Sequence, residues 1–148
     1  MVAFVDDADY EAVSQFNWHV KKCGDLVYAH RNLKNPDGVW TTQTLHKFLI
    51  PEAVFVDHED RDGLNDQRYN LRPCTRSQNG GNRKRNKNGS SNFKGVGWHI
   101  RIKKWAARIG FNSKRIHIGF FNSEEDAARA YDEAAKKYHG EFARLNFQ

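Results

Sequence analysis

The chain has 148 residues, enough for one ordinary domain or two small ones, and its 39% hydrophobic and 28% charged residues are typical of a globular protein with a modest core. Its net charge of +6 and pI near 9.4 point to a polyanionic partner. No apolar run reaches the ~20 residues of a membrane span, and the acidic residues near the start are unlike a secretory signal. The two cysteines form no Cys-x-x-Cys pair, which indicates a reducing compartment and argues against a zinc ribbon.

The charges are unevenly distributed along the chain. Residues 1–74 hold 8 Lys/Arg against 12 Asp/Glu, whereas residues 75–148 hold 16 Lys/Arg against 6 Asp/Glu. Between Thr75 and Ser123 there are 12 basic residues and no acidic one. A solvated surface normally mixes both signs, so this stretch predicts a surface that binds phosphates.

Residues 1–42 alternate short apolar stretches with turn signals. The turns are expected at residues 22–25 and 35–38, which contain Gly24 and Gly38. The pattern predicts a small antiparallel β meander, with a short helix over residues 9–14.

Residues 43–79 predict a helix, a strand, a polar loop, a second strand and a closing helix. Leu45, Phe48 and Leu49 have helical spacing before Pro51, and an apolar strand over residues 54–56 precedes a polar loop over residues 59–70. Leu71 begins the second short strand, and Thr75 is a suitable N-cap for the closing helix.

This segment also carries a metal-binding and a proton-accepting group in close succession. Asp57 and Asn79 offer the carboxylate and amide oxygens that a hard cation such as Mg²⁺ prefers. His58 carries an imidazole, which can take a proton from water near neutral pH. Such a combination suits metal-assisted hydrolysis of a phosphodiester.

The order and spacing of Asp57, His58, Asn70 and Asn79 resemble the HNH nuclease motif, in the form found in phage homing endonucleases, where Asn replaces the last His. The resemblance implies an α+β fold with a ββα-metal core that hydrolyses double-stranded DNA. Asp57 and Asn79 would be the metal ligands, His58 the general base, and Asn70 the residue that holds the two strands in register. Mg²⁺ is the expected metal, with Mn²⁺ as the alternative, and neither zinc nor a small-molecule cofactor is expected.

The sequence leaves the geometry of the Asp57–His58 pair and the roles of three neighbouring residues less closely defined. Regular alternation points Asp57 and His58 to opposite faces, so the strand must end or bend at this pair. Arg72 and Arg76 could hold the scissile phosphate, or could equally be solvated charges. His46, in a Leu-His-Lys sequence that also fits the homing-nuclease pattern, is given a supporting role.

Residues 80–92 are basic and rich in Gly and Asn, which predicts a linker that is flexible when DNA is absent. Gly80 and Gly81 follow Asn79 directly, and each costs a helix about 1 kcal/mol relative to Ala. The closing helix is therefore expected to be short or frayed.

Residues 93–148 predict a second domain. Strands are expected at residues 93–99, 105–111 and 115–121, followed by a helix that begins with a Ser123–Asp126 capping box and ends near Gly140. Together with Lys94-Gly95-Val96, Trp105-Ala106-Ala107 and Leu145-Asn146-Phe147, this resembles the plant APETALA2/ethylene-response-factor (ERF) DNA-binding domain.

That resemblance implies a three-stranded sheet lying in the DNA major groove. The candidate DNA contacts are Lys94, Trp98, Arg101, Lys104, Arg108, Arg115 and His117. Trp105 and Phe120 are expected to pack in the core, and His99 is expected to have a structural or a surface role. Arg108, Gly110 and His117 depart from the plant pattern, so the plant target sequence is not assumed.

The sequence thus predicts a nuclease core at 43–79 behind a meander at 1–42, a linker at 80–92 and a DNA-binding domain at 93–148. The favoured function is a metal-dependent, monomeric nicking or homing endonuclease, encoded by a phage and acting in the bacterial cytoplasm. The alternative is a non-catalytic, transcription-factor-like DNA-binding regulator with a degenerate nuclease fold. An RNA-binding protein is disfavoured because aromatic stacking motifs are lacking.

Overall fold

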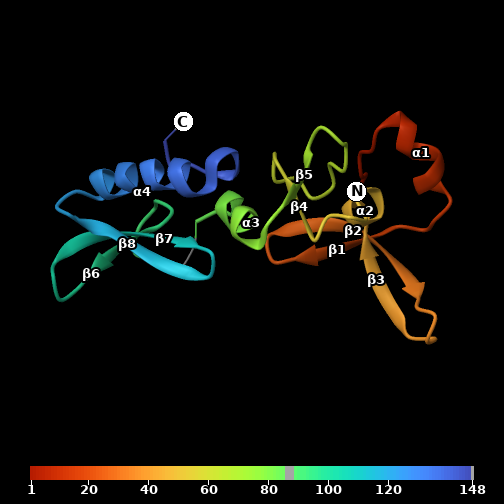
Figure 1. The fold of residues 1–148 in the computed structure, drawn as a ribbon, viewed down its shortest axis with the longest axis horizontal. Helices are drawn as coiled ribbons and strands as arrows, with labels where there is room; N and C mark the ends of the chain where they lie inside the picture. The colour runs from red at the N-terminus through yellow and green to blue at the C-terminus, as the bar shows by residue number, and fades with distance from the viewer. Residues whose placement is uncertain (86–88, 148) are drawn as a thin grey trace. The chain divides into compact units, whose positions relative to one another are not determined.

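The computed structural model describes residues 1–85 and 89–147 and divides into two compact units, Met1–Cys74 and Thr75–Gln148 (Figure 1). The division falls where the charge balance changes sign, so the first unit is acidic and the second basic. Within the described ranges, no helix combines the length and apolar composition that crossing a membrane requires.

The first unit contains the predicted antiparallel meander. Helix α1 (Asp7–Ser14) precedes strands β1 (His19–Cys23), β2 (Leu26–Lys34) and β3 (Trp40–Thr44), which pair in the order β1-β2-β3. Helix α2 (Leu45–Leu49) follows directly, and β4 (Phe55–His58) pairs antiparallel with β5 (Leu71–Cys74) in a separate two-stranded sheet. The short helix and both strands of residues 43–74 are therefore confirmed.

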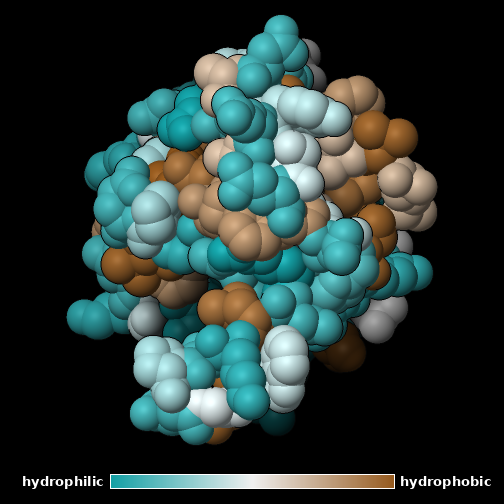
Figure 2. All heavy atoms as spheres, turned by 90° about the vertical axis from the view of Figure 1, so that its right-hand side faces the viewer, coloured by the Kyte–Doolittle hydropathy of each residue, from teal (hydrophilic) through white to brown (hydrophobic). Residues whose placement is uncertain are grey.

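The core of the first unit joins α2 to β4 and β5. Leu45 and Leu49 are the buried residues of α2, and they belong to one cluster with Val56 and Leu71. The face drawn in Figure 2 mixes hydrophilic and hydrophobic residues.

The polar loop between β4 and β5 is held by the start of the chain. The Phe4 amide donates to the Leu64 carbonyl at 2.7 Å, and the Asp66 amide donates to the Phe4 carbonyl at 2.8 Å. Gly63 lets the loop lie close to β2, because a Cβ at this position would come within 2.6 Å of the Tyr28 ring. The loop is therefore fixed by residues distant in sequence.

The second unit is a three-stranded sheet covered on one face by a long helix. Helix α3 (Arg76–Asn82) precedes β6 (Val96–His99), β7 (Lys104–Phe111) and β8 (Lys114–Phe121), paired antiparallel in that order. Helix α4 (Glu124–His139) and a 3₁₀ turn, η1 (Gly140–Phe142), complete the unit, and α4 runs along the sheet in Figure 1. The Ser123 hydroxyl accepts from the Asp126 amide, which confirms the predicted N-cap.

The first strand of this sheet is shorter than predicted, since it starts at Val96 and not at residue 93. Gly95 has a positive φ of 76°, and a Cβ there would overlap the Tyr131 ring. Lys94 is fixed instead by a hydrogen bond from its amide to Asn146 Oδ1 at 2.6 Å.

Helix α3 is longer than the sequence suggests. Thr75 and Gln78 form a capping box, and the helix continues through both glycines to Asn82, so the prediction that a linker begins at residue 80 is wrong for residues 80–82. Gly81 permits close packing on α4, because a Cβ would lie 2.8 Å from His139 Cγ. The flexibility expected of residues 86–88 falls outside the described part of the chain.

Candidate active site and nucleic-acid interface

Asp57 is buried near the end of β4 and is paired with an arginine. It lies opposite Arg72 in the β4–β5 register, and Arg72 Nη2 approaches Asp57 Oδ2 at 2.6 Å. Asp57 is 5% exposed, and Arg72 Nη1 also lies 3.7 Å from Glu59 Oε1. Arg72, a predicted phosphate contact, therefore neutralises the carboxylate predicted to bind metal.

His58 takes a different partner from Asp57, although the two residues are adjacent. Strand β4 ends at His58, as the sequence required, and His58 Nε2 lies 3.2 Å from Asp66 Oδ1. Burial raises the pKa of Asp66, while its hydrogen bond with His58 opposes that rise. Asp66 is fully buried, so its carboxylate can orient the imidazole in an environment with little water screening.

His46 lies beside this pair. Its ring centroid is 5.0 Å from that of His58, and its Nδ1 is 3.8 Å from Asp66 Oδ1. Its Nε2 is 2.9 Å from Thr44 Oγ1. Burial, followed by the nearby His58, lowers the pKa of His46 to about 3, so the ring is neutral at ordinary pH.

Asn70 ties the acidic loop to the start of β5. Its Oδ1 accepts from the Asp60 amide at 2.9 Å, and its Nδ2 donates to Asp60 Oδ1 at 3.0 Å and to the Asn65 carbonyl at 2.7 Å. Asn70 is buried, and through these contacts it organises the segment that follows His58.

The predicted metal ligands belong to different units. Asn79 lies on α3, where its amide donates to the Thr75 carbonyl at 3.0 Å, whereas Asp57 belongs to the first unit. The oxygen donors of both side chains have the chemistry that Mg²⁺ prefers, although one Asp57 oxygen is occupied by Arg72. A metal ion shared by Asp57 and Asn79 stays a prediction.

The face of the second-unit sheet opposite α4 carries several candidate DNA contacts. Arg108 pairs directly with His117 in the β7–β8 register, so both side chains project from the same face, and both are exposed. Phe120 also lies on this face, 37% exposed and with its ring centroid 4.4 Å from that of His117. The prediction that Phe120 packs in the core is wrong, whereas Trp105 does pack against the core cluster.

A break in strand pairing explains the position of Phe120. Arg108 pairs with His117 but Ala107 pairs with Gly119, so Ile118 has no partner on β7 and the alternation of β8 shifts by one residue. On β6, Trp98 pairs directly with Trp105 and therefore shares the side of the sheet that faces the helix. Trp98, although 43% exposed, is displaced from the open face.

His99 occupies the open face in place of Trp98. It pairs with Lys104 at the end of the β6–β7 ladder, and its ring centroid lies 5.2 Å from that of Phe120. The predicted contact Arg101 is exposed in the turn between these strands. His99 is absent from the predicted DNA contacts, because its side of the sheet follows from its pairing with Lys104, which the sequence alone does not reveal.

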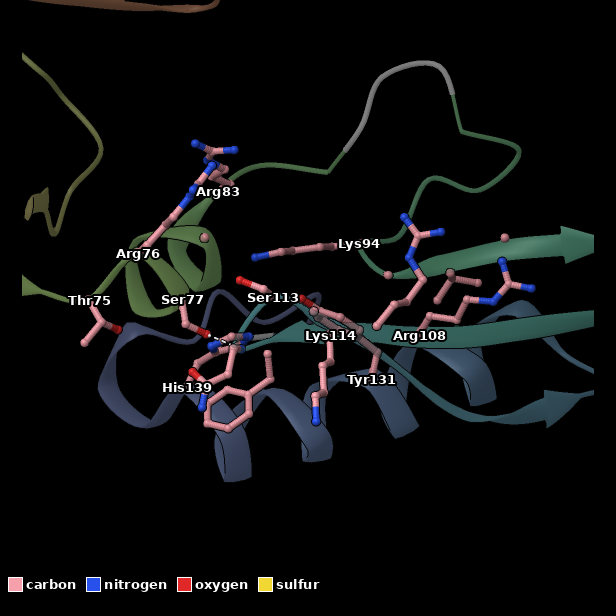
Figure 3. Close-up of a pocket in the computed structure, with 18 of the residues that line it drawn as sticks. Thr75, Arg76, Ser77, Arg83, Lys94, Arg108, Ser113, Lys114, Tyr131 and His139 are labelled. Carbon is pink, nitrogen blue, oxygen red and sulfur yellow. Dashed lines mark hydrogen bonds between the residues drawn. The ribbon is translucent and has the colours of Figure 1, made fainter.

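The open face borders a basic cavity of about 890 Å³ inside the second unit (Figure 3). We name this cavity the basic groove. Among the described residues its lining contains no Asp or Glu. The basic side chains that line it are Arg76, Arg83, Lys94, Arg108, Lys114 and Arg115.

The groove combines two elements that are separate in sequence. Arg76 extends from the start of α3, Arg83 directly follows its last residue, and Arg108 comes from β7 (Figure 3). Lys94 Nζ donates to the Gly81 carbonyl and so helps to fasten α3 to the unit. The structure thus places Arg76 in the groove of the second unit, and it places Lys94 in a contact that holds this groove together.

Comparison with known proteins finds one match within the second unit and another over nearly the whole chain. The family model of the AP2 domain matches residues 91–141. An uncharacterized HNH endonuclease of Acanthamoeba polyphaga mimivirus is 32% identical over 152 aligned positions, which cover 97% of this chain and 74% of the relative. The chain belongs to the family of this mimivirus HNH endonuclease.

This HNH-family chain also matches plant proteins, two of them over about 60 residues. An ethylene-responsive transcription factor of Arabidopsis thaliana is 44% identical over 61 residues, and an APETALA2-like protein of Oryza sativa subsp. indica is 45% identical over 62 residues. Each match covers 40% of the chain but only 14% of the plant protein. The AP2 domain implies that the chain binds DNA.

Proposed function

We propose that the protein is a metal-dependent DNA endonuclease that nicks double-stranded DNA, with the second unit holding the substrate. The observation that carries this proposal is the Asp57–His58 pair at the end of β4, where His58 is oriented by a fully buried carboxylate 3.2 Å away. Family membership with the mimivirus HNH endonuclease supports the same reaction class.

His58 would act as the general base that takes a proton from the attacking water. Asp66 holds the ring through Nε2 and would stabilise the imidazolium that forms, so it is a positioning residue. Asp57 and Asn79 would hold Mg²⁺, which when bound supplies positive charge to the scissile phosphate. Arg72 would orient the Asp57 carboxylate through its 2.6 Å contact.

The second unit would bind duplex DNA through its open sheet face and the basic groove. Arg108 and Arg115 are exposed and line the groove, and their guanidinium groups can contact phosphates or guanine edges. Exposed Arg76 and Arg83, at the start of α3 and just after its end, would extend the phosphate-binding surface beyond the residues matched by the AP2 model.

A plasmid nicking assay tests the proposal. Supercoiled plasmids carrying a library of viral and bacterial genomic fragments would be incubated with wild type, His58→Ala or His19→Ala, in Mg²⁺ or EDTA. His19 is an exposed histidine of the same unit and serves as the matched control. We expect Mg²⁺-dependent conversion to open circles by wild type and His19→Ala, and at least a hundredfold loss in His58→Ala.

A non-catalytic DNA-binding regulator is the second candidate. The similarity of residues 91–141 to plant transcription factors and the engagement of Asp57 by Arg72 favour it. Gel retardation of the same fragments without any strand cleavage, in Mg²⁺ or Mn²⁺, would select this candidate and reject the nuclease.

A further inference from the structure

Two imidazoles and one carboxylate converge beside the proposed active site. A ligand atom from each of His46, His58 and Asp66 can be chosen so that all three lie within 4.8 Å of one another. The residues come from α2, β4 and the loop after it, so only the folded unit assembles them. We name this group the His-His-Asp cluster.

Two polar atoms in the cluster make no hydrogen bond within the part of the chain that the structure describes. They are Asp66 Oδ2, on a fully buried side chain, and His46 Nδ1. A buried carboxylate oxygen without a partner is costly, commonly by about 1–3 kcal/mol. A cation coordinated in the cluster would give both atoms a partner.

The hydrogen bond on the far side of His46 can hold the tautomer that a metal needs. When His46 Nε2 donates to Thr44 Oγ1, 2.9 Å away, the lone pair is on Nδ1, which faces Asp66. Metal-binding histidines usually have such a second hydrogen bond, because it fixes both the tautomer and the ring orientation. Burial also keeps this ring neutral by lowering its pKa.

We propose that the His-His-Asp cluster is a site for Zn²⁺ or a related transition metal, separate from the Asp57–Asn79 pair. Two imidazoles and one carboxylate, with a remaining position for water, suit zinc, whereas Mg²⁺ prefers an all-oxygen environment. The sequence did not suggest this site, because its residues are separated by 12 and 8 positions and form no zinc-binding pattern.

Zinc at the cluster would inhibit the nuclease. A neutral imidazole has one N–H and one lone pair, so coordination through Nε2 leaves a proton on Nδ1 and no lone pair to accept another. His58 would then be unable to act as a base, whichever nitrogen faces the water. This inhibitory effect rests on the proposed nuclease function, whereas zinc binding does not.

Zinc binding by the intact protein is measured first, without DNA. Zn²⁺ would be titrated in competition with a chromophoric chelator, and Co²⁺ would be added separately to record the visible absorption of nitrogen-coordinated cobalt. The proteins are wild type, His46→Gln, Asp66→Asn and the exposed-histidine control His19→Gln. Circular dichroism establishes that each variant is folded.

We expect wild type and His19→Gln to bind one Zn²⁺ with equal affinity, and His46→Gln and Asp66→Asn to bind at least tenfold more weakly. Absence of binding by wild type would overturn the site. Equal binding by all four proteins would also overturn it, because the metal would then be held by exposed histidines elsewhere. If only Asp66→Asn fails to fold, the comparison of His46→Gln with His19→Gln decides.

Nicking in excess Mg²⁺ is then measured with and without micromolar Zn²⁺, and each variant is normalised to its own zinc-free rate. Inhibition that is strong in wild type and at least tenfold weaker in His46→Gln supports the regulatory role. Equal nicking with the cluster occupied by zinc would overturn that role. Zinc binding by a protein that never nicks DNA would refute the proposed function and leave the metal site standing.

Discussion

Replacement of Asn70 by Ala should loosen the loop between β4 and β5 while leaving the second unit intact. Asn70 makes three hydrogen bonds, of 2.7, 2.9 and 3.0 Å, to Asn65 and Asp60, and its side chain is buried. At about 1 kcal/mol of net stabilisation for each bond, Asn70→Ala loses about 3 kcal/mol. A change of that size corresponds to roughly a hundredfold shift in the local opening equilibrium.

Hydrogen exchange followed by mass spectrometry resolves this effect by segment. Peptides spanning residues 55–74 should exchange roughly a hundredfold faster in Asn70→Ala than in wild type, while peptides from the second unit should keep their rates. Asn17→Ala provides the control, because Asn17 is an exposed asparagine of the same unit and its replacement should alter stability by no more than about 0.5 kcal/mol.

The outcome also separates two explanations of any lost activity. If peptides 55–74 exchange at wild-type rates in Asn70→Ala, the three hydrogen bonds do not hold the loop and the reasoning is refuted. If exchange accelerates and nicking falls in parallel, Asn70 acts through the loop that follows His58, and no direct contact with substrate is needed.

Three further predictions concern the second unit. In urea unfolding, Gly80→Ala should stabilise the protein by up to about 1 kcal/mol, since a Cβ at residue 80 meets nothing within 4 Å. Gly81→Ala should destabilise it by about 1–3 kcal/mol, because the added Cβ crowds His139 on α4, and the reverse order of stabilities would contradict this packing. Burial, and then the charge of nearby Lys94, lowers the pKa of His139 below 6.5. Below pH 6.5 the unfolded chain therefore binds a proton at His139 more readily than the folded chain does, and stability falls as the pH drops. His139→Gln should weaken this fall, measured as urea midpoints between pH 7.5 and 5.5, and an unchanged pH profile would exclude a contribution of His139. Arg108→Ala and Arg115→Ala should each reduce the salt dependence of DNA binding by about one unit of slope, and an unchanged slope would remove that residue from the interface.

The sequence predicts local elements well where local chemistry determines them. The Ser123 cap and the Thr75 cap are both present, because short-range side-chain bonds to the first helical amides fix where these helices begin. The end of β4 at His58 also agrees with local reasoning, because regular alternation would point Asp57 and His58 to opposite faces unless the strand ends or bends at this pair.

Features that depend on pairing between distant segments could not be predicted in this way. The sequence predicts Phe120 in the core, but one unpaired residue in β8 reverses the alternation beyond it and leaves Phe120 exposed. The closing helix was expected to fray at its glycines, yet Gly81 is the position where α3 packs closely on α4. Asp66 was overlooked as the partner of His58, because contacts from the Phe4 backbone position its loop.

The division of charge between the units has a consequence for how cleavage would depend on salt. The acidic first unit carries His58 and Asp57, so it repels phosphates, and DNA affinity must come from the basic second unit. Raising the salt concentration should therefore slow nicking at low protein concentration, where binding limits the rate. It should have little effect on the single-turnover rate at saturating protein, because the buried His58–Asp66 pair is screened weakly by ions.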